Sequence, residues 1–103
     1  MKSTLRLRPE AEADLKEAYR WHEKQRRGLG DDFLLYVEAA LSALQENPKQ
    51  FAFVYKEVRR TLVRRFPYTI FYVAQREGIM VLAIFHARRN PKIWQNRVGK
   101  KAD

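Results

Sequence analysis

Two apolar runs in the second half of the chain form its most pronounced pattern. Residues 68–73 and 79–85 are rich in β-branched and aromatic side chains, which favour strands over helices. Neither run alternates strictly between apolar and polar positions, so we expect both strands to be covered on two faces. Arg76, Glu77 and Gly78 separate the runs, and glycine tolerates the positive φ that a tight turn requires. The pattern therefore predicts a β-hairpin at the centre of a sheet.

Two amphipathic helices are predicted in the first half of the chain. The first opens at Pro9 and ends at Gly28, and its apolar positions recur every three or four residues. The second follows an N-cap at Asp31 and runs to Glu46, because Asn47 precedes a proline and so avoids the α region. Only a few residues join the helices, which predicts an antiparallel hairpin. Their two apolar stripes are expected to cover one face of the sheet.

The remaining segments complete the predicted sheet. Ser3–Arg8 alternates leucine with arginine, which is typical of an edge strand, and Val58–Arg65 forms a further strand. Lys49–Lys56 fits either a loop or the start of a strand. We predict an α+β fold with the element order β-α-α-β-β-β, in which an N-terminal helical hairpin covers one face of an antiparallel four-stranded sheet. Residues 1–98 would form a single domain, and residues 99–103 a flexible tail.

The positive charge of the chain is confined to one half of it. Residues 1–50 contain nine basic and nine acidic side chains. Residues 51–103 contain twelve basic and three acidic ones, so the second half carries the entire net charge of +9. A charge so unevenly distributed indicates a surface that binds a polyanion, either nucleic acid or an acidic protein.

Composition excludes several classes of protein. With 46% apolar residues the chain is globular, and without cysteine it has neither disulfides nor thiolate chemistry. Two histidines and no cysteine predict no metal site, and no phosphate-binding glycine loop or other cofactor motif is present. No apolar run approaches the roughly 20 residues that span a bilayer, and the N-terminus lacks the apolar core of a signal peptide. We therefore expect a cytoplasmic protein without a cofactor.

A resemblance to a known family rests on five segments in a fixed order: PEAEADL, GDDF, ALSALQENP, RRFPYTIFYV and HARRNPKIW. Over residues 4–94 the chain resembles the RelE/ParE superfamily of bacterial toxins, the small basic partners in type II toxin–antitoxin modules. The resemblance implies the β-α-α-β-β-β fold and growth arrest by the unpartnered toxin. It also implies a cognate acidic antitoxin with which the toxin forms a hetero-oligomer in the bacterial cytoplasm.

The targets of this superfamily are of two kinds. RelE-like members cut messenger RNA on the ribosome, whereas ParE-like members are non-enzymatic poisons of DNA gyrase. The FPYTIFYV strand and the His-x-Arg-Arg-x-Pro ending resemble the ParE-like branch, which implies gyrase as the target. A ribosome-dependent, metal-independent endoribonuclease is the first alternative. A non-toxic basic nucleic-acid-binding module is the second.

A catalytic site for RNA cleavage would lie among the arginines of the second half. Attack by a 2′-hydroxyl needs a base, an acid and cations around the phosphate. His86 is the candidate base, since histidine exchanges a proton near neutral pH. The candidate cations are Arg65, Arg88 and Arg89, and strand alternation would place Arg88 on the same face as His86. The competing interpretation makes His86 a structural residue or an antitoxin contact.

The acid is the missing member of such a site. Trp94 stands where nuclease members of the superfamily commonly carry a tyrosine or a second basic group. Tyr55, Tyr68 and Tyr72 are the candidate acids, although the last two are expected to pack in the sheet. Trp94 itself lies in a segment, residues 92–98, that predicts one terminal turn. Its indole would stack on a base, anchor the partner protein or form a lid on the core.

The other cations are predicted to bind the target or nucleic acid. Alternation places Arg59 and Arg65 on one face of their strand, and Arg60 and Arg64 on the other. At least one pair is expected to be solvated or to form salt bridges with helix acids. The predicted binding residues are Lys56, Arg59, Arg60, Arg64 and Trp94.

Overall fold

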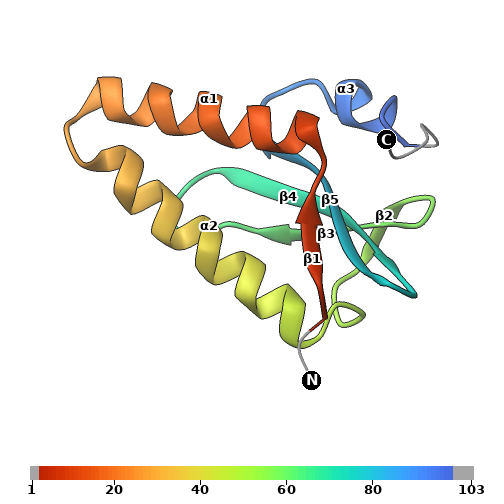
Figure 1. Ribbon diagram of the computed structural model, residues 1–103. Coiled ribbons are helices and arrows are strands. Elements are labelled where there is room, and N and C mark those ends of the chain that lie inside the picture. The colour runs from red at the N-terminus through yellow and green to blue at the C-terminus, as the bar shows by residue number, and fades with distance from the viewer. Residues whose placement is uncertain (1–2, 99–103) are drawn as a thin grey trace.

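The computed structural model describes residues 3–98, which form a twisted sheet with a pair of long helices packed against it (Figure 1). Along the chain the elements are β1 (Leu5–Leu7), α1 (Pro9–Gln25), α2 (Leu29–Glu46), β2 (Phe53–Tyr55), β3 (Val58–Leu62), β4 (Tyr68–Gln75), β5 (Gly78–His86) and α3 (Pro91–Gln95). The α+β class and the helical hairpin are confirmed. The flexible tail predicted for residues 99–103 lies outside the described residues.

The sheet differs from the prediction in two respects. It has five strands in the order β1-β5-β4-β3-β2, and β1 pairs in parallel with β5 while the other neighbours are antiparallel. The prediction of four antiparallel strands is therefore wrong. Phe53–Tyr55 forms the additional strand because Lys56 adopts a positive φ of 50°, which reverses the chain toward β3. Alternation specifies the two faces of a strand but not its neighbour, so the direction of β1 does not follow from its sequence.

The central hairpin of β4 and β5 is confirmed. Its register runs from Tyr68 opposite His86 to Gln75 opposite Gly78. Gly78, with φ 145°, lies where β1 approaches the hairpin, and a Cβ atom there would be 2.5 Å from the carbonyl oxygen of Thr4. The glycine is therefore required both by the backbone conformation and by the closeness of the neighbouring strand.

A β-bulge decides which side chains of β5 face the helices. The register between β4 and β5 shifts near the middle of the hairpin. As a result Val81 and Ile84 both pack toward the helices, while Leu82 and Ala83 between them pack on the opposite side. Residues 79–85 are buried throughout, which accounts for the unbroken apolar run in the sequence.

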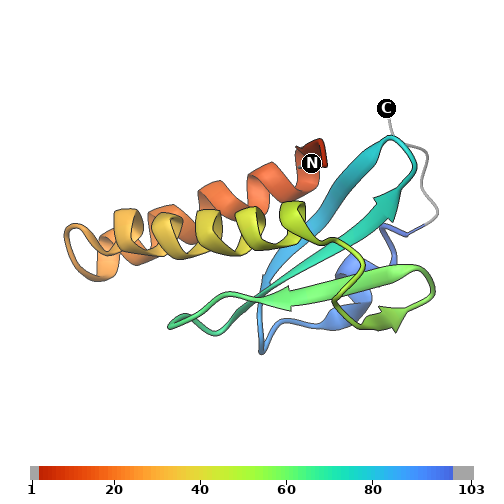
Figure 2. The ribbon, with the colours of Figure 1, turned by 90° about the horizontal axis from the view of Figure 1, so that it is seen from below.

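The helices α1 and α2 lie side by side along one side of the sheet (Figure 2). Phe33, Val37 and Leu44 of α2 are completely buried there, as the helical periodicity predicts. His22 of α1 is also buried and stacks on the Phe33 ring with 4.5 Å between the centroids. Its Nδ1–H donates to the Ala18 carbonyl at 2.7 Å, so this histidine is a satisfied core residue.

The connection between the helices is held by one carboxylate. Glu23 accepts hydrogen bonds from the backbone N–H groups of Gly28 and Gly30, both at 3.0 Å. The second helix therefore begins at Leu29, and the prediction of an N-cap at Asp31 is wrong. The side chain that satisfies the first N–H groups of α2 comes from α1, through the fold of the hairpin.

Replacing Glu23 by glutamine is expected to lower the thermal midpoint of unfolding at pH 7. The Gly28 and Gly30 hydrogen bonds lower the pKa of Glu23 below its ordinary value of 4.5. The stabilisation is therefore fully present above about pH 4.5 and is lost as the pH falls through the lowered pKa. Melting curves of both proteins between pH 7 and pH 3 should converge at the acid end. Glu38→Gln, at an exposed glutamate of α2, is the control and should leave the midpoint unchanged.

Candidate functional site

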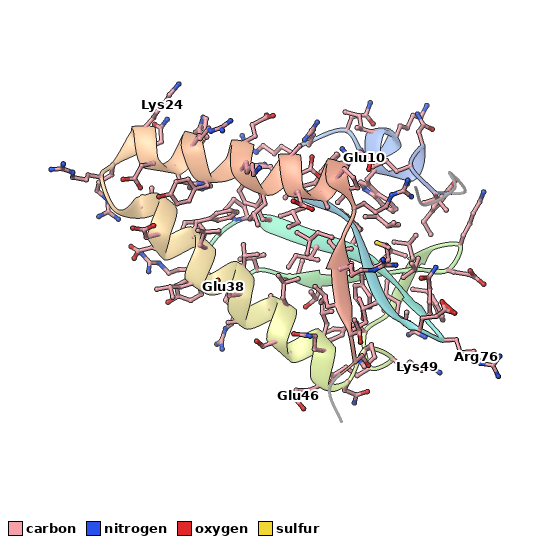
Figure 3. The ribbon with its side chains drawn as sticks, viewed as in Figure 1. Glu10, Lys24, Glu38, Glu46, Lys49 and Arg76 are labelled. Carbon is pink, nitrogen blue, oxygen red and sulfur yellow. The ribbon has the colours of Figure 1, made fainter. Side chains whose placement is uncertain are left out.

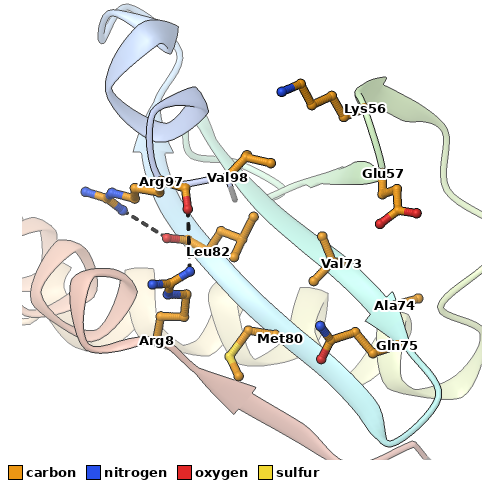
Figure 4. Close-up of a pocket in the computed structure, with 10 residues that line it drawn as sticks. All are labelled: Arg8, Lys56, Glu57, Val73, Ala74, Gln75, Met80, Leu82, Arg97 and Val98. Carbon is orange, nitrogen blue, oxygen red and sulfur yellow. Dashed lines mark hydrogen bonds between the residues drawn. The ribbon is translucent and has the colours of Figure 1, made fainter. Parts of the chain in front are cut away.

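An open groove crosses the face of the sheet that the helices leave uncovered (Figure 4). Its volume is about 440 Å³, and its apolar wall is formed by Val73, Met80 and Leu82. Charged side chains stand around this wall. We call this hollow the sheet-face groove, and it is lined by Arg8, Lys56, Glu57, Val73, Ala74, Gln75, Met80, Leu82, Arg97 and Val98.

One end of the sheet-face groove is held by a buried ion pair. Asp14 of α1 accepts hydrogen bonds from both terminal nitrogens of Arg97, at 2.8 Å and 3.2 Å, and from the Ile84 backbone N–H at 3.1 Å. The Arg97 guanidinium also donates to the Leu82 carbonyl at 2.9 Å, and Arg8 donates to the Arg97 carbonyl at 3.5 Å. These bonds tie α1, the bulged part of β5 and the segment after α3 together.

The predicted catalytic arginines meet at one end of the sheet but their side chains have separate partners. The Ala87 N–H donates to the Pro67 carbonyl at 2.8 Å, so the two loops lie side by side as expected. The Arg65 guanidinium lies over the Tyr36 ring on α2, 5.4 Å from its centroid. Arg89 instead lies 4.0 Å from the Phe85 ring centroid and 3.6 Å from the Asp14 carboxylate. Arg65 and Arg89 therefore have different partners, one on α2 and the other on α1 and β5.

His86 lies at the end of the central hairpin, beside an aromatic neighbour. It is the last residue of β5, and its ring packs edge-on against Tyr68 at 5.3 Å. The Arg88 backbone N–H donates to His86 Nδ1 at 3.0 Å. The neutral imidazole therefore carries its proton on Nε2, and its one unprotonated nitrogen is already engaged. Arg88 follows the strand in a turn, so the prediction that it shares a strand face with His86 is wrong.

The predicted binding arginines divide into engaged and unengaged side chains. Arg59 donates to the Lys49 and Phe51 carbonyls at 3.1 Å and 2.7 Å, so it fastens the loop before β2. Strand β3 ends at Leu62, so the alternation expected for Arg64 and Arg65 does not apply. Lys56 lies over the Tyr55 ring. Within residues 3–98, three predicted cations form neither an ion pair nor a cation–π contact: Arg60, Arg64 and Arg88.

Trp94 forms the lid on the core and does not offer a stacking surface. It is 4% exposed, and its ring stacks on Phe71 with 4.0 Å between centroids. Tyr55 packs against its edge at 5.7 Å. The helical turn that carries it is α3, and the predicted terminal turn is confirmed.

The three candidate acids are all at least partly buried. Tyr72 is completely buried, and its hydroxyl donates to the Pro48 carbonyl at 2.6 Å. Burial raises the pKa of Tyr72, and Arg59 lowers it to a lesser degree. Burial likewise raises the pKa of Tyr68, with a smaller contribution from Glu17. Tyr68 packs against His86, the candidate base, whereas the Tyr72 phenol is closed off from solvent.

Comparison with known proteins identifies the family. The family model described as the ParE toxin of the type II toxin–antitoxin system parDE matches residues 5–91. The chain belongs to the ParE toxin family. Toxin ParE2 from two strains of Mycobacterium tuberculosis is 30% identical to it over 92 residues, which cover 88% of each chain.

A solved structure shares the fold of this ParE family member. The structure titled "Chromosomal ParDE TA system from P. aeruginosa" superposes with a TM-score of 0.74 at 19% sequence identity. The match covers 82% of this chain and 96% of the other. The mixed sheet with its helical hairpin is therefore an arrangement that this ParE family chain has in common with that structure.

Sequence reasoning missed the residues that frame the sheet-face groove of this ParE family protein. Arg97 and Asp14 were absent from the predicted site, although Asp14 carried a signal. It lies three residues after Ala11 and four before Ala18, so a carboxylate interrupts the apolar stripe of α1. A buried carboxylate at such a position requires a partner. Arg97 had no comparable signal because it follows a short terminal turn.

Residues 3–98 contain neither a metal-binding cluster nor a membrane-spanning helix. Between residues 3 and 98, no group of three His, Asp or Glu side chains is arranged to hold a metal ion. None of the helices in that range is both long and apolar enough to cross a bilayer.

Proposed function

We propose that this ParE family toxin arrests bacterial growth in the cytoplasm by binding DNA gyrase, and that a cognate acidic antitoxin neutralises it. Family membership supports the toxic function, and the resemblance to the ParE-like branch supports the target. The packing of the candidate catalytic groups is the observation that favours a gyrase poison over a nuclease.

In that packing, the side chains that RNA cleavage would use as base, acid and cation already have other partners. The one free nitrogen of His86 accepts the Arg88 N–H, and Trp94 fills the core where a nuclease would need an acid. Arg89 is paired with Asp14 and stacked on Phe85. His86 and Tyr68 line one hollow with Arg89, but their rings pack edge-on against each other, which does not favour a base and an acid on opposite sides of a phosphate.

The sheet-face groove fits the proposed antitoxin. An acidic segment with apolar side chains would place those side chains on Met80 and Leu82 and its carboxylates near Lys56 and Arg8. Binding there would both cover the apolar surface and offset part of the excess positive charge of the chain. The resulting toxin–antitoxin hetero-oligomer would be inactive because the bulk of the bound antitoxin keeps the target from docking on the toxin.

The purified toxin is expected to inhibit supercoiling by purified gyrase, and stoichiometric antitoxin should restore it. His86→Ala should still inhibit gyrase, because inhibition by binding requires no proton transfer from the ring. In cells, induction without the antitoxin should raise DNA-damage signalling while messenger RNAs stay intact. Supercoiling assays on agarose gels and mapping of messenger RNA ends measure these outcomes.

A nuclease would give the opposite pattern. Discrete cuts in translated messages within minutes of induction, lost in His86→Ala, would replace the gyrase proposal with the RelE-like alternative. A general base contributes roughly a hundredfold or more to rate, so its removal would be evident. A toxin that affects neither gyrase nor messages would leave only the nucleic-acid-binding alternative, which predicts affinity that falls steeply with salt.

A further inference from the structure

A second hollow lies on the helix side of the molecule, between the middle of α1 and the end of β5. It has a volume of about 290 Å³ and shares no lining residue with the sheet-face groove. Trp21, Tyr68 and His86 form its aromatic walls, and Ala18 and Ile84 are the small apolar residues between them. Trp21 is 56% exposed, so a large aromatic surface stands open beside this hollow. We call it the Trp21 pocket.

The charges around the Trp21 pocket are not equally available. Asp14 is saturated by Arg97, by the Ile84 N–H and by Arg89, and the Arg89 guanidinium is in turn stacked on Phe85. Glu17 also lines the pocket, and within the described chain its carboxylate has neither an ion pair nor a hydrogen bond. Glu17 contributes to raising the pKa of Tyr68, which places its charge near that phenol.

These observations describe the chemistry of the occupant. An aromatic wall attracts a cation through the negative face of the ring, and an unpaired carboxylate beside it attracts the same charge. An anion would instead meet the Glu17 carboxylate, while the lining cation Arg89 is held beside Asp14 and over the Phe85 ring. The hollow is large enough for one long side chain, and its apolar floor suits the methylene stem of lysine or arginine.

The other side of Trp21 is more basic. Lys16, Arg20 and Lys24 are spaced four residues apart along α1 and line an adjoining hollow together with Trp21 and Glu17. Lys24 projects outward from α1 in Figure 3. A protein surface that matched both sides would therefore carry one basic side chain flanked by carboxylates.

We propose that the Trp21 pocket receives a lysine or arginine side chain of the toxin's protein target, stacked on Trp21 and paired with Glu17, while acidic residues of that target face Lys16, Arg20 and Lys24. This inference rests on the proposed function, in which the target is gyrase. It separates the two partners of the toxin. The antitoxin occupies the sheet-face groove, and the target contacts α1 on the helix side.

Glu17→Lys tests the sign of the occupant's charge. The variant places a cation where the proposal requires an anion, so its affinity for gyrase and its inhibition of supercoiling should fall about tenfold or more. Trp21→Ala should weaken both by about tenfold through loss of the stacking surface. Binding to the antitoxin, measured by calorimetry, should equal that of the wild type in both variants. Leu35→Ala, a 62% exposed leucine of α2 that lines neither hollow, is the matched control and should behave as the wild type.

The outcomes separate this inference from the function on which it rests. If the wild type does not inhibit gyrase, the proposed function fails and the inference falls with it. If the wild type inhibits and both variants inhibit equally well, only the Trp21 pocket proposal is wrong. If Glu17→Lys binds its target more tightly, the pocket meets an anion such as a nucleic-acid phosphate, which also overturns the proposal. Circular dichroism melting confirms that each variant is folded, and Glu17, which is exposed, carries the test even if Trp21→Ala is less stable.

Discussion

Asp14→Ala is expected to lower the free energy of unfolding by about 3–5 kcal/mol. The Asp14 side chain is 6% exposed, and its carboxylate is paired with Arg97, whose side chain is 11% exposed. Its removal leaves a largely buried guanidinium and the Ile84 backbone N–H without their acceptor. Chemical denaturation at pH 7 measures the change. Glu12→Ala, at an exposed position of the same helix, is the control and should change stability by less than about 0.5 kcal/mol.

A double-mutant cycle distinguishes this pair from general damage to the fold. Arg97→Ala alone should also destabilise strongly, because it leaves the buried Asp14 carboxylate with weaker partners. The double variant should be less unstable than the sum of the two single changes, since no unpaired buried charge then remains. If the losses in free energy of unfolding were additive, Asp14 and Arg97 would act independently. That result would contradict the assignment of their ion pair as the contact that holds the segment after α3.

Trp94→Ala should cost about 3–5 kcal/mol in the free energy of unfolding, as deletion of a buried aromatic side chain typically does. The indole is 4% exposed and lies between Phe71 and Tyr55. Its loss opens a cavity under α3 and exposes part of the sheet face. Trp94→Phe keeps a ring over Phe71 and should recover much of the loss.

Hydrogen exchange localises the effect of Trp94. In Trp94→Ala the amides of residues 91–95 should lose protection first, because the indole packs α3 against the sheet. A variant that is as stable as the wild type but has lost affinity for nucleic acid or for a partner would contradict this assignment. It would restore the interpretation of Trp94 as a stacking or anchoring residue.

The helices and the central hairpin follow from the sequence because their signals are local. Pro9 opens α1, and the apolar stripe of α2 reproduces the buried Phe33, Val37 and Leu44. The parallel pairing of β1 with β5 is not local, since Leu5 meets Ile79 across most of the chain. Strand alternation is equally compatible with either direction of pairing.

The candidate site was harder to predict because it depends on the directions of long side chains. The strand ends at Pro67 and Pro91 predicted that Arg65, His86 and Arg89 lie at one end of the sheet, and the hydrogen bond from Ala87 to the Pro67 carbonyl agrees with this. The two arginine side chains nevertheless point to different partners: Arg65 lies over Tyr36, and Arg89 lies beside Asp14. Spacing along two strands carries no information about such choices, which depend on tertiary packing.

The pairing of the first strand with the last has a consequence for biosynthesis. Leu5, Arg6 and Leu7 find their hydrogen-bonding partners only at residues 79–81, and the Asp14 carboxylate finds its own only at Arg97. A nascent chain therefore cannot close its sheet until nearly all of it has left the ribosome, because contacts of such long sequence separation form late. The sheet of this domain is therefore completed only after the helical hairpin and the central strands have been synthesised.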